Sequence, residues 1–217
     1  ATDLNGAVDD HSTDSYRFTS KESLDAVHRL RRDCDTVLIG VETVIRDNPS
    51  LTIRRVELGN GRQPLRIVLD RSLRIPLDSN IINDEHETLI LHNEGEEETA
   101  NMLSNRDNVK VMQIKTDNSH NGVDLNHLLS LLGDLESQEV LVEGGPETAR
   151  RFLDSGLIDR AIIIQSNAEF KQPLQLGITD EDFTNNGLVN IGQKNWGEDV
   201  VAFWSRKELE WPNQNWP

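Results

Sequence analysis

The feature that most constrains the fold is an apolar run ending in a carboxylate, two glycines and a proline, Val-Leu-Val-Glu-Gly-Gly-Pro at residues 140–146. A run without polar alternation is typical of a strand buried on both faces of a parallel sheet. Gly144 and Gly145 allow close approach of a ligand to the backbone, and Pro146 suits the first position of a helix. The amides of such a helix start favour an anion such as a pyrophosphate. Plain turn chemistry also accounts for the Gly-Gly-Pro sequence.

Other segments alternate between strand and helix patterns. A helix is predicted from Ser20 to about Asp33, and helical spacing recurs in two later segments, 125–132 and 147–157. Strands are predicted at 36–40, 65–69, 88–91, 109–114, 139–142 and 161–164, with a loop at 41–54. This alternation predicts an α/β fold with a mostly parallel central sheet flanked by helices. Residues 188–191 and 200–204 predict a terminal antiparallel hairpin at the sheet edge.

Composition excludes several classes of protein. Among 217 residues, 22 Lys and Arg stand against 38 Asp and Glu, and the formal charge of −16 argues against nucleic acid or an anionic membrane as partner. The single cysteine, Cys34, excludes an internal disulfide framework. The six histidines show no metal-ligand spacing, so no metal is expected. Because no stretch approaches the ~20 apolar residues that span a bilayer, we expect a soluble intracellular protein, in the cytoplasm or in an organelle.

The first helix carries an arginine on its apolar face. Leu24, Val27, Leu30 and Cys34 lie on one side of a helical wheel, and Arg31 falls within the same arc. An arginine that points inward needs an anion. A ligand phosphate and a neighbouring carboxylate both meet this need.

The segment 40–54 follows a predicted strand, as a ligand-binding loop does. Thr43 supplies a hydroxyl, Asp47 an acceptor held by the following Asn48-Pro49 pair, and Arg54 a planar fork suited to phosphate. A simple turn and a surface arginine explain the same residues.

Taken together, these stretches resemble the reductase family of riboflavin biosynthesis, whose fold is similar to that of dihydrofolate reductase. The resemblance extends from about residue 1 to 165 and rests on Ser15 with Thr19-Ser20, on 27–31, 40–54, 63–70 and 141–145. It implies a single reductase domain over 1–210, and the tail at 211–217 is expected to be poorly ordered because chain ends commonly are. It also implies a homodimer that uses NADPH to reduce the ribosyl chain of a pyrimidine ribosylamine 5′-phosphate to a ribityl chain. Both the deaminated and the diamino pyrimidine stay open as substrate.

The resemblance also implies roles for matched positions. Glu143 and Asp47 are the implied catalytic residues, with Glu143 bonding sugar hydroxyls or relaying a proton. The implied substrate-binding residues are Ser15, Arg31, Leu51, Arg54 and Glu143. The implied cofactor-binding residues are Thr43 and Asp47 at the nicotinamide ribose, Gly145, Pro146, Glu147, Thr148, Ala149, Arg150 and Arg151 at the phosphates, and Ala1, Arg17 and Arg71.

Several positions depart from the family pattern. Glu42 replaces a Gly or Ala, Arg71 replaces a Ser or Thr and is suited to the 2′-phosphate of NADPH, and 165–170 lacks a Pro and Leu-Gly-Gly pattern. Relatives have tryptophan at Arg17 and a lysine two residues before Ala1, so we expect a processed form or fragment, or a chain without that lysine. Two alternatives stay open: a nucleotide-binding relative with reduced catalysis, and a reductase acting on another carbonyl or imine.

Overall fold

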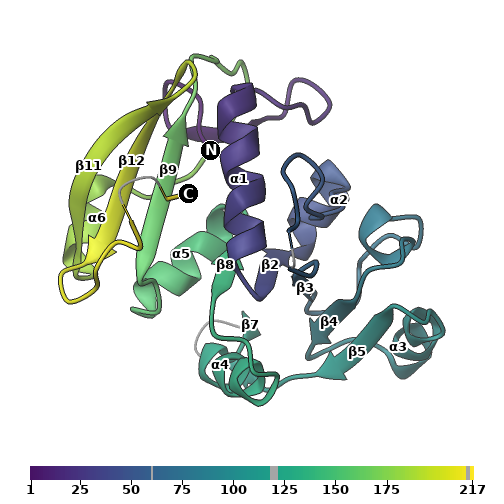
Figure 1. The fold of residues 1–217 in the computed structure, drawn as a ribbon. Coiled ribbons are helices and arrows are strands. Elements are labelled where there is room, and N and C mark those ends of the chain that lie inside the picture. The colour runs from purple at the N-terminus through teal and green to yellow at the C-terminus, as the bar shows by residue number, and fades with distance from the viewer. Residues whose placement is uncertain (60, 118–121, 214–215) are drawn as a thin grey trace. The chain divides into compact units, whose positions relative to one another are not determined.

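The computed structural model describes residues 1–59, 61–117, 122–213 and 216–217. The chain forms two compact units, one made of residues 1–29 and 145–217 and the other of residues 30–144 (Figure 1). Helix α1 (Lys21–Asp33) begins in the first unit and ends in the second, with the bounds expected from the sequence. The single domain over 1–210 stays a prediction, and residues 214–215 of the predicted tail lie outside the described residues.

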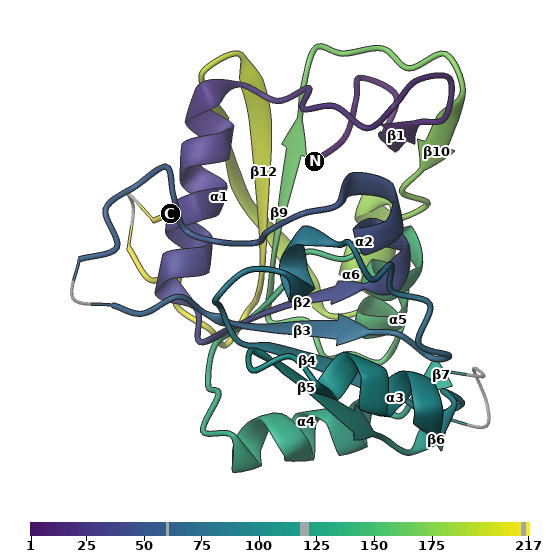
Figure 2. The same ribbon diagram turned by 90° about the vertical axis from the view of Figure 1, so that its right-hand side faces the viewer.

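The unit of residues 30–144 contains a five-stranded parallel sheet in the order β5-β4-β3-β2-β8. Figure 2 shows β2 to β5 lying side by side. The strands are β2 (Thr36–Gly40), β3 (Leu65–Leu69), β4 (Thr88–His92), β5 (Val109–Gln113) and β8 (Val140–Val142). All five confirm strands predicted from the sequence. However, β8 is one of the two edge strands and its residues are half-buried, so its prediction as a doubly buried strand was wrong.

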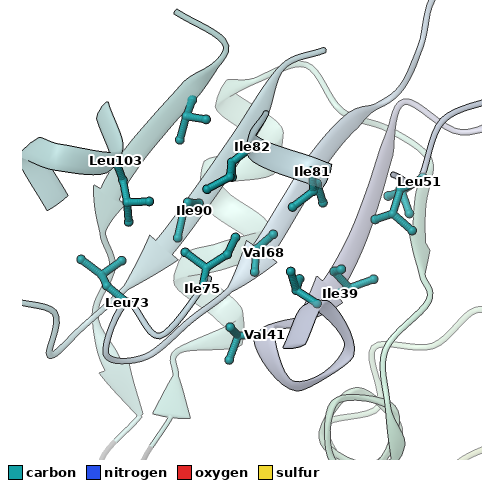
Figure 3. Close-up of a cluster of buried hydrophobic side chains, with 13 residues drawn as sticks. Ile39, Val41, Leu51, Val68, Leu73, Ile75, Ile81, Ile82, Ile90 and Leu103 are labelled. Atoms are coloured by element: carbon teal, nitrogen blue, oxygen red, sulfur yellow. The ribbon is translucent and has the colours of Figure 1, made fainter. Parts of the chain in front are cut away.

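Consecutive residues of the inner strands point to opposite faces of this sheet, and both faces are buried. On one face Ile39, Val68 and Ile90 join a core cluster that also holds Val44 and Leu103 (Figure 3). The elements that supply this face are α2 (Val41–Asp47), the short helix η1 (Asn80–Ile82) and α3 (Glu97–Ser104). The unit is completed by α4 (Leu125–Asp134), which confirms a predicted helix, and by the small pair β6 (Thr116–Asp117) and β7 (Gly122–Val123).

The predicted loop 41–54 was wrong in its first half, which is helix α2. Val41 and Val44 lie one turn apart and are both buried, so a single apolar face holds this short helix in place. Asn48 ends the helix in the left-handed conformation, with φ 42°, and its amide donates to the Val44 carbonyl at 2.9 Å. Pro49 then prevents continuation, as is common after a helix C-cap.

The other unit contains an antiparallel sheet in the order β11-β12-β9. Its strands are β9 (Arg160–Gln165), β11 (Leu188–Trp196) and β12 (Asp199–Arg206). The predicted terminal hairpin is confirmed, but it pairs with β9 in a separate sheet and does not extend the parallel one. The sequence misleads because β9 contributes to two clusters, Ile162 and Ile164 to one and Ala161 and Ile163 to another, which is the apolar pattern of a parallel strand.

Further elements complete this unit. Helix α5 (Pro146–Asp154) confirms a predicted helix, although it ends three residues early. Three elements escaped prediction: β1 (Ala7–Asp10), its antiparallel partner β10 (Pro173–Gln175), and α6 (Asp180–Asn185). They are only three to six residues long, too short for apolar periodicity to develop.

The terminal hairpin fixes the beginning of α1. Ser20 accepts a hydrogen bond from the Ser23 amide at 3.1 Å and donates its hydroxyl to the Trp196 carbonyl at 2.6 Å. The Asp199 carboxylate accepts from the Ser20 amide at 2.8 Å and from the Ser23 hydroxyl at 2.5 Å. The helix start predicted from Ser20 therefore depends on residues far along the chain.

A partly buried ion pair connects β3 to the loops beside it. The Arg66 side chain, only 1% exposed, donates to both Asp84 carboxylate oxygens at 2.6 and 2.7 Å and to the Ser50 carbonyl at 2.9 Å. Burial raises the pKa of Asp84, but the hydrogen bonds from Arg66 and the His86 amide and the Arg66 charge outweigh it. The pKa of Asp84 therefore lies below its ordinary value of 3.8.

This pair predicts a loss of stability in acid. A carboxyl whose pKa is lowered by folding adds stability above its unfolded pKa, and that contribution is lost as pH falls through the folded value. We expect Asp84→Asn to destabilise the chain at pH 7 and the difference from the parent to shrink below about pH 4. Urea unfolding between pH 3 and 7 measures this, with the exposed Asp78→Asn as control. A difference that stays constant with pH would contradict the assignment.

Candidate functional site

Predicted site residues follow the carboxyl ends of neighbouring parallel strands. Thr43 follows β2, Arg71 follows β3 and Glu143 follows β8. The strands β8 and β2 are hydrogen-bonded neighbours, and the Glu143 amide donates to the Leu38 carbonyl at 2.9 Å. This edge of an open α/β sheet is where ligands bind.

The anion that Arg31 needs is the carboxylate of Glu143. Arg31 Nε and Nη2 donate to Glu143 Oε1 and Oε2, each at 2.6 Å, and the two side chains are 11% and 21% exposed. Burial lowers the pKa of Arg31, but the charge and hydrogen bonds of Glu143 outweigh it and raise that pKa above its ordinary value. The pair is bidentate, so it fixes both the position and the plane of the carboxylate.

Thr52 joins Arg54 to this pair. The Thr52 carbonyl accepts from Arg31 Nη1 at 3.5 Å, and its hydroxyl accepts from Arg54 Nη1 at 3.1 Å. One hydrogen-bonded chain thus links Glu143, Arg31, Thr52 and Arg54, and we call it the Glu143–Arg54 network. Arg54, at one end of this network, is exposed. Thr52 was not singled out from the sequence, since its bond to Arg31 is made by its backbone carbonyl.

The residue before Thr52 is strained. Leu51 has φ 54°, in the left-handed region, while its side chain is buried. A non-glycine residue in that region costs roughly 1–3 kcal/mol and persists only when its surroundings impose it. This predicted substrate residue therefore holds the backbone of the network in an unusual conformation.

The predicted cofactor residues of α2 lie one turn apart. Thr43 is in its first turn and Asp47 is its last residue, so both lie on the same side of the helix. The neighbouring Glu42 carboxylate, which the family pattern made a concern, is 67% exposed and hydrogen-bonds to Arg74. Its negative charge is thus paired on the surface.

Arg71 is held by Glu94. Arg71 Nε and Nη2 donate to the two Glu94 carboxylate oxygens, each at 2.6 Å, and the side chains are 40% and 46% exposed. The hydrogen bonds from Arg71 lower the pKa of Glu94. A phosphate that binds Arg71 must therefore displace this carboxylate.

In the other unit, the start of α5 confirms the predicted turn and helix. Gly145 is the N-cap and provides no side-chain cap, and Pro146 occupies the first turn. The following amides, at Glu147 and Thr148, belong to the first turn of a helix, whose donors have no partner within the helix.

The arginines of α5 differ in position. Arg150 donates to the Gly177 carbonyl and to both Asp182 oxygens, at 2.8 and 3.2 Å, and its hydrogen bonding to Asp182 lowers the pKa of that carboxyl. Arg150 is therefore held by the start of α6, an element that the sequence did not predict. Arg151 and Ala149 are half-buried on the same helix.

The remaining predicted residues lie at or before the start of α1. Ala1, Ser15 and Arg17 are exposed. Near them is a pocket of about 310 Å³ lined by Tyr16, Phe18, Thr19, Ser20, Asn167, Ala168, Glu198 and Asp199. Phe18 packs edge to face on the buried Phe170 with ring centroids 4.9 Å apart. The segment 165–170, which departs from the family pattern, thus contributes to the aromatic wall beside this pocket.

The single cysteine, Cys34, is half-buried. Burial, followed by the charges of Glu139, Asp33, Asp35 and Glu143, raises the pKa of the Cys34 thiol to about 12. A raised pKa favours the neutral thiol, which is a weaker nucleophile than the thiolate. In the part of the chain that the structure describes, no three His, Cys, Asp or Glu side chains are grouped to hold a metal ion. No described helix is long and apolar enough to cross a membrane.

The parallel sheet with its ligand edge and the antiparallel hairpin sheet place the chain in the dihydrofolate-reductase-like class of α/β proteins. Residues 1–167 match the family described as RibD C-terminal domain, and the chain belongs to that family.

Named relatives agree with this membership. Riboflavin biosynthesis protein RibD of Aquifex aeolicus is 35% identical over 208 residues, covering 95% of this chain and 56% of its own length. The 2,5-diamino-6-ribosylamino-4(3H)-pyrimidinone 5′-phosphate reductase of Archaeoglobus fulgidus is 32% identical over 167 residues, covering 73% of this chain and 74% of its own. The chain thus spans little more than half of the RibD protein.

Solved structures share the fold. Acinetobacter baumannii RibD superposes with a TM-score of 0.74 at 22% identity, over 94% of this chain and 55% of that one. The deaminase/reductase of Thermotoga maritima, described as a 5-amino-6-(5-phosphoribosylamino)uracil reductase, gives 0.71 at 23% identity, over 94% and 54%. At these identities the likeness concerns the fold alone.

Proposed function

We propose that this chain is an oxidoreductase that uses NADPH to reduce the ribosyl chain of a 5-amino-6-ribosylamino-pyrimidine 5′-phosphate to a ribityl chain. The observation that carries the proposal is the Glu143–Arg54 network at the carboxyl edge of the sheet. It joins a positioned carboxylate to an exposed guanidinium, the two groups that a sugar phosphate requires. The names of the relatives support the same substrate class.

Within the network, the two ends have different chemistry. The exposed Arg54 is suited to the 5′-phosphate, because a guanidinium binds phosphate through two parallel hydrogen bonds. Each Glu143 carboxylate oxygen accepts one hydrogen bond from Arg31, and each has a second lone pair that can accept a hydrogen bond from a sugar hydroxyl. In the proposed reaction Glu143 orients these hydroxyls, or relays a proton between oxygens as the ribosyl ring opens.

The proposed cofactor residues fit NADPH in their chemistry. Thr43 and Asp47 offer a hydroxyl and a carboxylate for the nicotinamide ribose, and the start of α5 at Gly145 offers amides for the phosphates. Arg71 is the proposed partner of the 2′-phosphate, which takes the place of Glu94. When bound, NADPH supplies the hydride for the reduction. Ala1 and Arg17 are further proposed contacts, and a homodimer is proposed from the family.

A cofactor titration with turnover on the same sample tests this function. We expect saturable quenching of NADPH fluorescence, weaker binding of NADH, and oxidation of NADPH only when the pyrimidine ribosylamine 5′-phosphate is added. Glu143→Gln is the matched variant: it is expected to bind NADPH normally and lose turnover by on the order of 100-fold or more. Binding without turnover in the parent chain would instead favour a nucleotide-binding relative, and absence of binding would contradict the proposal.

A further inference from the structure

The segment that carries Thr52 and Arg54 is fastened by a side chain outside it. The Gln63 carboxamide accepts a hydrogen bond from the Ile53 amide at 2.7 Å and donates one to the Ile53 carbonyl at 3.0 Å. Gln63 therefore satisfies both backbone groups of one residue, as a neighbouring strand does in a sheet. Ile53 is buried, so water cannot easily replace Gln63 as the hydrogen-bond partner of its amide and carbonyl.

A second attachment lies on the other side of the strained residue. Arg66, which is buried and paired with Asp84, donates to the Ser50 carbonyl at 2.9 Å. Leu51, with its left-handed backbone, thus lies between two anchored residues, Ser50 and Ile53. Such strain persists only where surrounding structure over-determines it. Gln63 and Arg66 supply that structure.

We propose that Gln63 is a positioning residue for the reduction: it holds Ile53 so that Thr52 and Arg54, on either side, are set to bind the substrate phosphate. The inference rests on the proposed function. A side chain must offer both a donor and an acceptor at this length to match both groups of Ile53, and the neutral glutamine carboxamide offers both at every pH. Gln63 itself touches neither of the two arginines through any bond that the structure shows, and acts through the backbone.

Three variants test this role. Gln63→Met removes both hydrogen bonds, and Gln63→Glu keeps the shape but loses the donor at neutral pH. Gln113→Met is the matched control, since the Gln113 amide also donates to a backbone carbonyl, that of Asn93, at 3.4 Å on an exposed strand end. We expect Gln63→Met to raise the KM for the 5′-phosphate substrate about tenfold, with kcat and the Kd for NADPH within about twofold of the parent. Gln113→Met should change none of these.

The glutamate variant adds a readout that general destabilisation does not give. A protonated carboxyl has a donor and an acceptor and restores both bonds to Ile53. The KM of Gln63→Glu should therefore fall toward that of the parent as pH is lowered through the pKa of the introduced carboxyl, relative to the parent at each pH. Amide hydrogen exchange at Ile53 should be faster in both Gln63 variants at neutral pH than in the parent.

The outcomes separate this inference from the proposed function. Unchanged exchange at Ile53 overturns the role of Gln63, and so does faster exchange with an unchanged KM in a chain that turns over. No turnover by the parent chain contradicts the proposed function instead, and the exchange rate at Ile53 still decides whether Gln63 fixes the segment.

Discussion

Replacing Arg31 with alanine is expected to lower kcat/KM by on the order of 100-fold and to destabilise the chain by about 2 kcal/mol. Removal of the guanidinium leaves the Glu143 carboxylate, 21% exposed, without its two 2.6 Å hydrogen bonds. A carboxylate in that state turns toward water, which moves the group proposed to meet the sugar. Urea unfolding and initial rates on the same preparation measure both effects.

A matched pair in the same unit provides the stability control. Arg71 and Glu94 have the same bidentate geometry, with both distances 2.6 Å, but their side chains are 40% and 46% exposed. Exposed pairs contribute about 0–1 kcal/mol, so Arg71→Ala should cost much less stability than Arg31→Ala. The double variant Arg31→Met with Glu143→Gln should regain part of the stability and none of the activity. Equal losses of stability at the two arginines would contradict the reasoning from burial.

The local pattern of apolar residues was sufficient to predict the strands of the parallel sheet. Each inner strand is rich in Leu, Ile and Val residues and is buried on both faces, and such a segment is visible without knowledge of its neighbours. The same pattern in β9 was assigned to the wrong sheet, because two-sided burial does not reveal strand direction. Helix α2 was missed since its seven residues contain only two buried positions.

The sequence was sufficient to predict which residues belong to the candidate site, but not which side chains bond to one another. The helical wheel placed Arg31 inward, and the Gly-Gly turn placed Glu143 at a strand end, but their bond joins positions 112 apart and depends on β8 lying beside β2. The pairing of Arg150 was not predictable for a further reason: its partner Asp182 lies on a helix that the sequence did not reveal. Gln63 carries no chemical signal in the sequence, since its effect is on the backbone of another segment.

The two arginines that the resemblance assigned to the substrate have different hydrogen-bond partners and different exposure. The three terminal nitrogens of Arg31 are directed to Glu143 and to the Thr52 carbonyl, whereas Arg54 is exposed and bonds to the Thr52 hydroxyl. We therefore expect the phosphate to be read by Arg54, while Arg31 orients the carboxylate.

Arg54→Ala is thus expected to raise the KM for the 5′-phosphate substrate about 10- to 100-fold, the effect of losing a charged hydrogen bond to phosphate. Since Arg54 is exposed, unfolding free energy and NADPH binding should stay unchanged. The decisive comparison uses the same substrate without its phosphate, for which the variant and the parent should have the same KM. Lys110→Ala removes the same charge from an exposed position on β5 and controls for the overall field. If Arg54→Ala weakened both substrates equally, Arg54 would be holding the segment rather than the phosphate, and Arg31 would be the remaining candidate for that anion.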